Sequence, residues 1–181
     1  MVELAVEASR ARVVAAARAE VAAGRLPFAR DRLAGLLAQH PADPEALDLL
    51  GAVCRELGDE VAAGRWWFLS ARDDPEADAA RAAFLAAQAE PWKAANALRV
   101  RAPAEAFPDE VQVRLADLVS EVAAAGGSWV PGQRAPLTPS TATQTRSWTE
   151  PFLIGGILLS TVGVWLVGVI TLVVLVVSAA S

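Results

Sequence analysis

Residues 43–75 decide the fold of this chain, and they read DPEALDLLGAVCRELGDEVAAGRWWFLSARDDP. Asp43 is a typical helix N-cap, and Pro44 is favoured at the first helical position. Apolar residues then recur every three or four positions, as they do on one face of a helix. These residues are Leu47, Leu50, Cys54 and Leu57. Gly58 ends this helix and Asp59 begins the next, so the stretch predicts two helices joined by a tight turn.

Several residues that bound or pack the helices of this stretch have counterparts 34 residues earlier or later in the chain. The pairs with this separation are Gly24 and Gly58, Ala29 and Ala63, Leu33 and Trp67, and Pro41 and Pro75. A helix–turn–helix unit of 34 residues is the period of the tetratricopeptide repeat, and the chain resembles that family over roughly residues 10–90. Leu50-Gly51 stands where the family has its Leu-Gly pair, although the first unit has Ala16-Ala17 there. The resemblance implies about two stacked helical hairpins.

Additional helices are expected after these hairpins. Helix 3–23 is expected to be the first helix of the first hairpin, and the helices expected after the hairpins cover 76–90, 92–101 and 109–125. Because two repeats are too few to bury their own apolar faces, the last helix is expected to cap the stack. The predicted fold class is therefore all-α, with one helical domain over residues 1–125. The Ala- and Arg-rich hairpins, the GDEVAAGRWWFLS stretch at 58–70 and the apolar C-terminal run together resemble a family of uncharacterised actinobacterial proteins, and that resemblance implies no activity.

The C-terminal run, residues 152–181, contains no charged residue. About 20 apolar residues span the hydrocarbon core of a bilayer, so one transmembrane helix is expected over 151–178. The Pro-, Ser- and Thr-rich residues 126–150 are expected to form a flexible linker. Arg134 and Arg146 precede the run and no Lys or Arg follows it, which predicts a cytoplasmic N-terminal domain. The expected location is the cell membrane, with a single tail-anchored span in contact with lipid.

Two features of this C-terminal part leave alternatives open. Gly156, Ser160 and Gly163 fall on one face of the expected span, and small residues let membrane helices approach closely. A homodimer through the span is one alternative, and a span that contacts lipid alone is the other. The Ser/Thr cluster at 140–145 could accept phosphate, although its composition favours a plain spacer.

The composition argues against catalysis and against nucleic-acid binding. The net charge is −5, whereas a nucleic-acid binder shows a basic face that neutralises phosphates. His40 is the only histidine and Cys54 the only cysteine, so a catalytic triad or a His-based metal site lacks partners. Cys54 lies in an apolar helical stripe and is expected to be a buried structural thiol. We therefore predict a protein that is not an enzyme and has no cofactor or metal.

The predicted function is that of a membrane-anchored interaction or scaffolding module that binds a protein partner. The tetratricopeptide resemblance implies a peptide groove along the first helix of each hairpin, with Arg18, Asp48 and Arg55 as its polar contacts. Trp66 either packs against the next hairpin or anchors a partner. The alternative function is a structural subunit of a larger membrane complex, in which the transmembrane helix makes the specific contacts.

Overall fold

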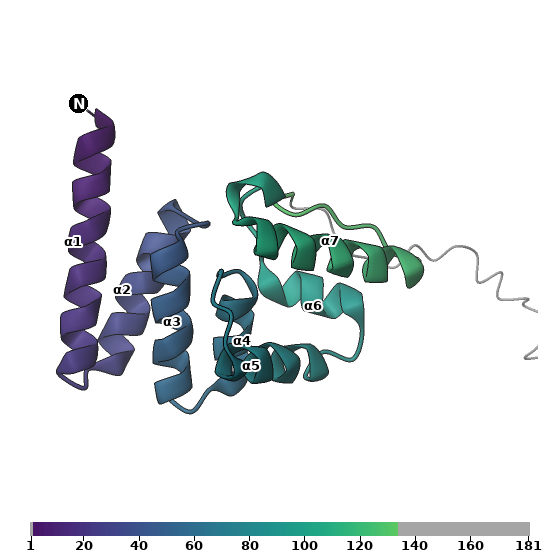
Figure 1. Cartoon of the computed structure of the whole chain (residues 1–181), viewed down its shortest axis with the longest axis horizontal. Helices are drawn as coiled ribbons and strands as arrows, with labels where there is room; N and C mark the ends of the chain where they lie inside the picture. The colour runs from purple at the N-terminus through teal and green to yellow at the C-terminus, as the bar shows by residue number, and fades with distance from the viewer. Residues whose placement is uncertain (1, 134–181) are drawn as a thin grey trace, which may run out of the picture. The chain divides into compact units, whose positions relative to one another are not determined.

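The computed structural model describes residues 2–133, which form seven α-helices and one short 3-10 helix, with no strand among them (Figure 1). The elements are α1 (Val2–Ala22), α2 (Leu26–Gln39), α3 (Pro44–Glu56), α4 (Glu60–Phe68), α5 (Pro75–Ala86), α6 (Pro91–Leu98), η1 (Ala104–Ala106) and α7 (Asp109–Ala124). The predicted all-helical class is confirmed for this part of the chain.

The expected transmembrane helix over 151–178, with Gly156, Ser160 and Gly163, lies outside the described residues, as does most of the expected linker. Within residues 2–133, every helix is too short or too polar to cross a bilayer.

Three aspartates fix the starts of the central helices. Asp43, Asp59 and Asp74 each accept a hydrogen bond from the backbone N–H three residues further on, at N···O distances of 2.8, 2.9 and 2.8 Å respectively. These bonds satisfy donors that the first turn of a helix leaves free. Gly24 and Gly58 follow α1 and α3 with φ of 70° and 80°, a left-handed conformation that glycine adopts without the steric cost of a Cβ. Local sequence therefore sets the element boundaries.

The first four helices pack as two hairpins, with α1 against α2, α3 against α4, and α2 against α3 between them. Two pairs of positions 34 residues apart are buried alike in these hairpins. Ala29 and Ala63 are fully buried, and so are Leu33 and Trp67. The small residues lie where the helices come close together, and the large ones fill the core between them.

Two glycines set how closely α4 approaches its neighbours. The Trp67 ring occupies the position that a Cβ on Gly51 of α3 would need, and the Trp67 indole N–H donates to the Asp48 carbonyl oxygen at 3.1 Å. On α4 itself, a Cβ on Gly64 would overlap the backbone of Ala80 in α5. The first contact packs the Trp67 ring against the backbone of α3, and the second brings α4 and α5 together at backbone distance.

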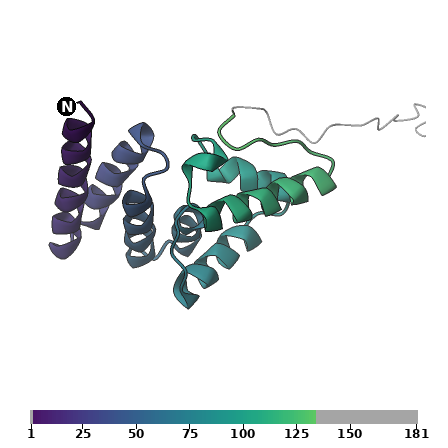
Figure 2. The ribbon, with the colours of Figure 1, turned by 45° about the horizontal axis from the view of Figure 1, so that its top comes forward.

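The third helical pair departs from the hairpin pattern. Helix α5 packs chiefly against α4 and only lightly against α6, and α6 packs more against α7 than against any other helix (Figures 1 and 2). Helix α6 has only eight residues, of which Ala94, Ala95 and Leu98 are buried. The segment after α6 consequently returns towards α2 and α4, where it contributes to the candidate site described below.

Two arginines tie the C-terminal helices to the end of α4. Arg81 of α5 and Arg114 of α7 both donate to the Trp67 carbonyl oxygen, at 3.4 and 3.2 Å. Arg114 also donates to the Ser70 carbonyl oxygen at 2.5 Å, and Arg81 to that of Arg72 at 2.7 Å. Cations beside a helix C-terminus are favoured by the helix dipole.

The packed part of the chain extends beyond α7. Trp129 is 7% exposed and belongs to the hydrophobic core, and the backbone of Gly132 lies against Ala102. The boundary that the composition predicts, at residue 125, assigns these residues to the linker, whereas the structure packs them against the helices. Glycine and proline around an isolated tryptophan hide its burial from a reading of periodicity.

Candidate functional site

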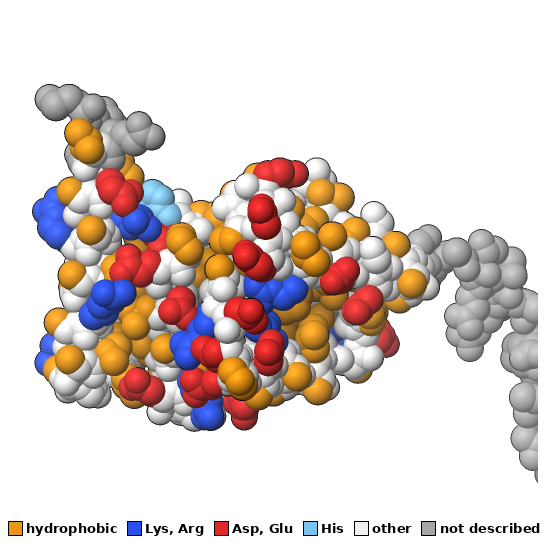
Figure 3. All heavy atoms as spheres, viewed as in Figure 1, with side chains coloured by type: hydrophobic (Ala, Val, Ile, Leu, Met, Phe, Trp, Pro, Cys, Tyr) orange, Lys and Arg blue, Asp and Glu red, His pale blue; other side chains and the backbone are white. Residues whose placement is uncertain are grey.

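The polar candidates for a groove on the first helices are engaged in ion pairs. The pairs are Arg18 with Glu45 at 2.7 Å, Arg55 with Glu76 at 3.4 Å, and Asp48 with Arg72 at 3.5 Å. Figure 3 shows acidic and basic side chains lying side by side on this view of the molecule. Their charges therefore offset one another at the surface. Arg72 also pairs with Glu76, so Asp48 and Arg55 belong to one chain of ion pairs. None of Arg18, Asp48 and Arg55 lines the two pockets described below.

Trp66, the remaining candidate, is partly buried and packs against the core. The Arg65 guanidinium carbon lies 4.4 Å from the centroid of its ring, within cation–π range. Trp66 also lines two surface pockets, so its ring is packed and yet remains accessible. Its expected role as an anchor for a partner stays a prediction.

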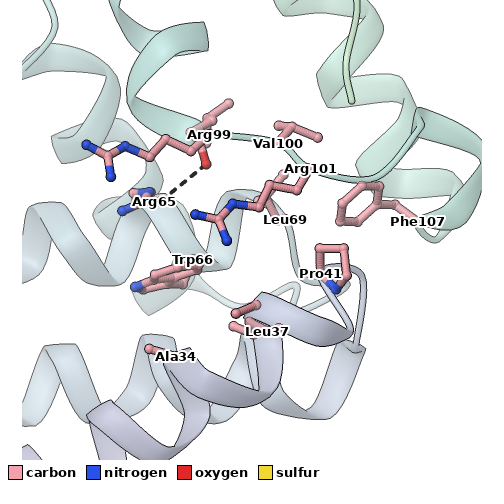
Figure 4. A pocket seen from close by; sticks show the side chains of 12 residues that line it. Ala34, Leu37, Pro41, Arg65, Trp66, Leu69, Arg99, Val100, Arg101 and Phe107 are labelled. Atoms are coloured by element: carbon pink, nitrogen blue, oxygen red, sulfur yellow. Dashed lines mark hydrogen bonds between the residues drawn. The ribbon is translucent and has the colours of Figure 1, made fainter. Parts of the chain in front are cut away.

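The first of these pockets, here the arginine pocket, lies between α2, α4 and the segment that follows α6 (Figure 4). Its volume is about 230 Å³. Arg65 and Trp66 come from α4, and Arg99 and Arg101 from the segment after α6. The apolar part of the lining includes Leu37, Pro41, Leu69, Leu98 and Phe107. Three cations and an aromatic ring thus line the pocket together with apolar side chains.

No carboxylate of the described residues balances these cations. The lining contains no Asp or Glu, and Arg65, Arg99 and Arg101 form no ion pair within residues 2–133. The Arg65 Nε is buried and has no hydrogen-bond partner in that part of the chain, and its Nη2 makes a long bond of 3.4 Å to the Leu98 carbonyl oxygen. Burial lowers the pKa of Arg65, and repulsion from Arg99 and Arg101 lowers it further. The guanidinium nevertheless stays charged, because an arginine side chain is not deprotonated in proteins.

The backbone is strained at this site. Arg99 has φ 50° and ψ 46°, and it is the one non-glycine residue with positive φ in the described part. A side chain in this left-handed region costs about 1–2 kcal/mol, and such residues concentrate at functional sites. The reversal at Arg99 ends α6 and directs the chain through Val100 and Arg101 along the pocket.

The second pocket, here the Cys54 pocket, adjoins the first and shares Ala34 and Trp66 with it. Its volume is about 490 Å³, and Leu50, Cys54, Leu57 and Ala62 form most of its apolar lining. Burial raises the pKa of the Cys54 thiol to about 11, so the thiol is protonated and a poor nucleophile at neutral pH. Arg30 and Asp59 provide its charged groups.

Sequence reasoning missed Arg65, Arg99 and Arg101, although one signal was present. Arg65 and Arg99 are 34 residues apart, the same interval that relates the two hairpins.

Within residues 2–133, no group of three or more His, Cys, Asp or Glu side chains lies close enough together to hold a metal ion.

Over residues 2–133, the fold and the pocket together define an all-helical domain with a cationic, aromatic surface pocket. The chain belongs to a family of unknown function, DUF6584, which matches residues 9–174. No curated protein and no solved structure matches the chain.

Proposed function

We propose that this protein is a non-enzymatic interaction module that is tethered to the cytoplasmic face of the cell membrane and binds a protein partner beside Trp66. The observation that carries the proposal is the convergence of Arg65, Arg99 and Arg101 on one pocket whose described lining contains no Asp or Glu. Like charges held together cost free energy, and an anionic group of a partner would offset that cost.

The scaffold of the proposed module is a pair of tetratricopeptide-like hairpins, α1 with α2 and α3 with α4. The matching burial of Ala29 with Ala63 and of Leu33 with Trp67 supports two equivalent units. Because the polar groups along α1 and α3 are in ion pairs, we place the docking surface on the α2 and α4 side instead. There, two adjoining pockets meet at Trp66.

The tether in this proposal is the uncharged run at residues 152–181. Its length satisfies the span requirement, and Arg134 and Arg146 before it favour a cytoplasmic helical domain. The family match extends to residue 174 and so includes most of this run together with the helical part.

Site-specific photo-crosslinking in intact membranes tests the docking surface. Ala34 is exposed and lines both pockets, so Ala34→benzoylphenylalanine places the crosslinker beside Trp66. Ala79 is exposed on α5 and provides the matched control. We expect a discrete protein adduct from position 34 alone, and we expect Arg99→Gln with Arg101→Gln to reduce it. Equal adducts at both positions, or an adduct that ignores the arginine changes, would contradict the proposal.

The same experiment separates this function from that of a subunit assembled through Gly156, Ser160 and Gly163. Residues 152–178 are replaced by an unrelated apolar run of equal length. A docking module keeps its adduct at position 34 after this exchange, because the span serves only as a tether. Loss of the adduct, with the chain still in the membrane, would favour the subunit alternative.

A further inference from the structure

We infer that the arginine pocket receives an acidic side chain of a protein segment, with a neighbouring large apolar side chain in the Cys54 pocket. This inference rests on the proposed function and specifies the chemistry of the partner.

The charge requirement comes from the three guanidinium groups. Arginine presents a planar fork of N–H donors that matches the two oxygens of a carboxylate. Arg99 and Arg101 are exposed and able to reorient, whereas the buried Arg65 Nε lacks a partner in the described part of the chain. A carboxylate entering the pocket would offset the repulsion among the three cations and give donors in the pocket an acceptor.

The apolar lining argues for a peptide rather than a small free anion. The arginine pocket has an apolar lining that includes Leu37, Leu69 and Phe107, and the larger Cys54 pocket beside it is mainly apolar. A free anion would use the cations and leave this apolar surface in contact with water. A chain segment with an acidic and an apolar side chain a few residues apart fills both pockets across Trp66, and burial of apolar area adds to the affinity.

The volume of the arginine pocket and the net charge of the helical part also favour a peptide segment as the ligand. At about 230 Å³ the arginine pocket is smaller than the roughly 300–1,000 Å³ typical of pockets for drug-sized ligands, so it fits a side chain better than a cofactor. Of all charged residues only Arg134, Arg146 and Glu150 lie beyond residue 133, and together they contribute +1. The whole chain carries −5, so residues 1–133 carry a net charge of −6. An acidic domain is repelled by extended polyanions such as nucleic acid or an anionic bilayer, whereas a short acidic segment needs only the local cationic pocket.

Peptide selection on the full chain tests the inference. The full-length protein in zwitterionic nanodiscs is panned against phage displaying random peptides of about twelve residues, a length that spans such grooves in extended form. We expect the selected peptides to carry Asp or Glu within a few residues of a large apolar side chain. In fluorescence polarisation with the synthetic peptides, replacing their acids by the corresponding amides is expected to weaken binding about tenfold, as for the loss of a charge-assisted contact.

Matched variants assign the effect to the pocket. Arg99→Gln with Arg101→Gln is expected to weaken peptide binding about tenfold. Arg12→Gln with Arg25→Gln removes the same charge from exposed arginines outside both pockets and is expected to change it less than about twofold.

Three results would overturn the inference. The first is a set of selected peptides without acidic enrichment, and the second is equal weakening by both double variants. The third is binding of inorganic phosphate or of phosphatidylglycerol vesicles that depends on Arg99 and Arg101 while no peptide is selected. If position 34 still crosslinks to a discrete protein when peptides show no acidic preference, this inference fails and the proposed function stands.

Discussion

The indole ring of Trp67 lies where the side chain of any residue other than glycine at position 51 would begin. Trp67 is fully buried, and its N–H donates to the carbonyl oxygen of Asp48, three residues before Gly51. The Arg72 guanidinium carbon lies 4.5 Å from the centroid of the ring. The spacing of α3 and α4 thus depends on a missing Cβ on one helix and a large ring on the other.

Gly51→Ala is therefore expected to destabilise the helical domain. The new methyl group would overlap a ring that a hydrogen bond holds in place, and overpacking of this kind costs about 1–3 kcal/mol. Thermal unfolding followed by circular dichroism in detergent checks this. The control is Gly35→Ala in α2, where a Cβ meets nothing within 4 Å. That change should raise stability by about 0.5–1 kcal/mol because alanine favours a helix interior. Equal effects of the two changes would refute the packing argument.

Gly64→Ala is expected to cost more than Gly51→Ala. Its Cβ would meet the backbone of Ala80 in α5, and a backbone moves less readily than a side chain. Relief requires α5 to shift away from α4, so we expect a loss of about 3 kcal/mol, at the upper end of overpacking effects. Unfolding midpoints measured side by side give the order of the two variants. A Gly64→Ala protein as stable as the parent would show that the two helices are not held at backbone distance.

Arg65→Met is expected to stabilise the domain while weakening the site. The change removes a buried Nε that has no partner among the described residues and relieves repulsion from Arg99 and Arg101. It also removes the contact over the Trp66 ring, so the net gain should be about 1 kcal/mol or less. Arg55→Met breaks an exposed ion pair with Glu76 and should instead be neutral or mildly destabilising. Chemical denaturation distinguishes the two, and a large loss of stability in Arg65→Met would show that Arg65 is structural.

Cys54 is expected to resist alkylation in the folded protein. The thiol is buried, and its pKa is raised to about 11, so little thiolate forms near pH 8. Mass spectrometry after iodoacetamide treatment should show slow modification of the native protein and rapid modification in denaturant. Rapid native modification would mean that the Cys54 pocket opens to expose the sulfur.

The cap of α5 is expected to make stability depend on pH. The hydrogen bond from the Ala77 backbone N–H, followed by that from Arg72, lowers the pKa of Asp74. Since the folded-state pKa is the lower one, its stabilisation is complete above the unfolded-state pKa of about 4 and is lost as the pH falls through the folded-state value. Asp74→Asn keeps an oxygen that can cap the helix but does not titrate. Chemical denaturation near pH 6 and near pH 3 gives the free energy of unfolding at each pH. Between the two, this free energy should fall less for the variant than for the parent.

Asp117→Asn, on the exposed face of α7, controls for the removal of one charge in this comparison. If both variants lose stability in acid as the parent does, the Asp74 cap is not a source of the pH dependence.

The helices could be predicted from the sequence because their signals are local. Asp43 and Asp59 cap helices, Gly24 and Gly58 end them, and each needs only a few neighbours to act. The burial of Trp67 was also predictable, because the 34-residue interval pairs it with Leu33. These features depend on spacing within one hairpin or between two.

The arginine pocket could not be predicted in the same way. It forms because the segment after α6 returns to α2 and α4, and that path follows from α6 packing more on α7 than on α5. The bonds of Arg81 and Arg114 were equally hidden, since their acceptors are backbone carbonyls that no residue type marks. Trp129 was assigned to the linker because glycine and proline surround it.

Arg81 and Arg114 share a main-chain acceptor, the carbonyl oxygen of Trp67. These two hydrogen bonds therefore do not themselves require a particular side chain at position 67. The side chains at this end of α4 matter for a different reason, because Trp67, Phe68 and Leu69 are buried in the core. An insertion of one residue within α4 is different, because it turns everything beyond it by about 100° and carries that oxygen away from both arginines. These two hydrogen bonds therefore constrain the length of α4 directly, because they need the Trp67 carbonyl oxygen at one place and in one direction.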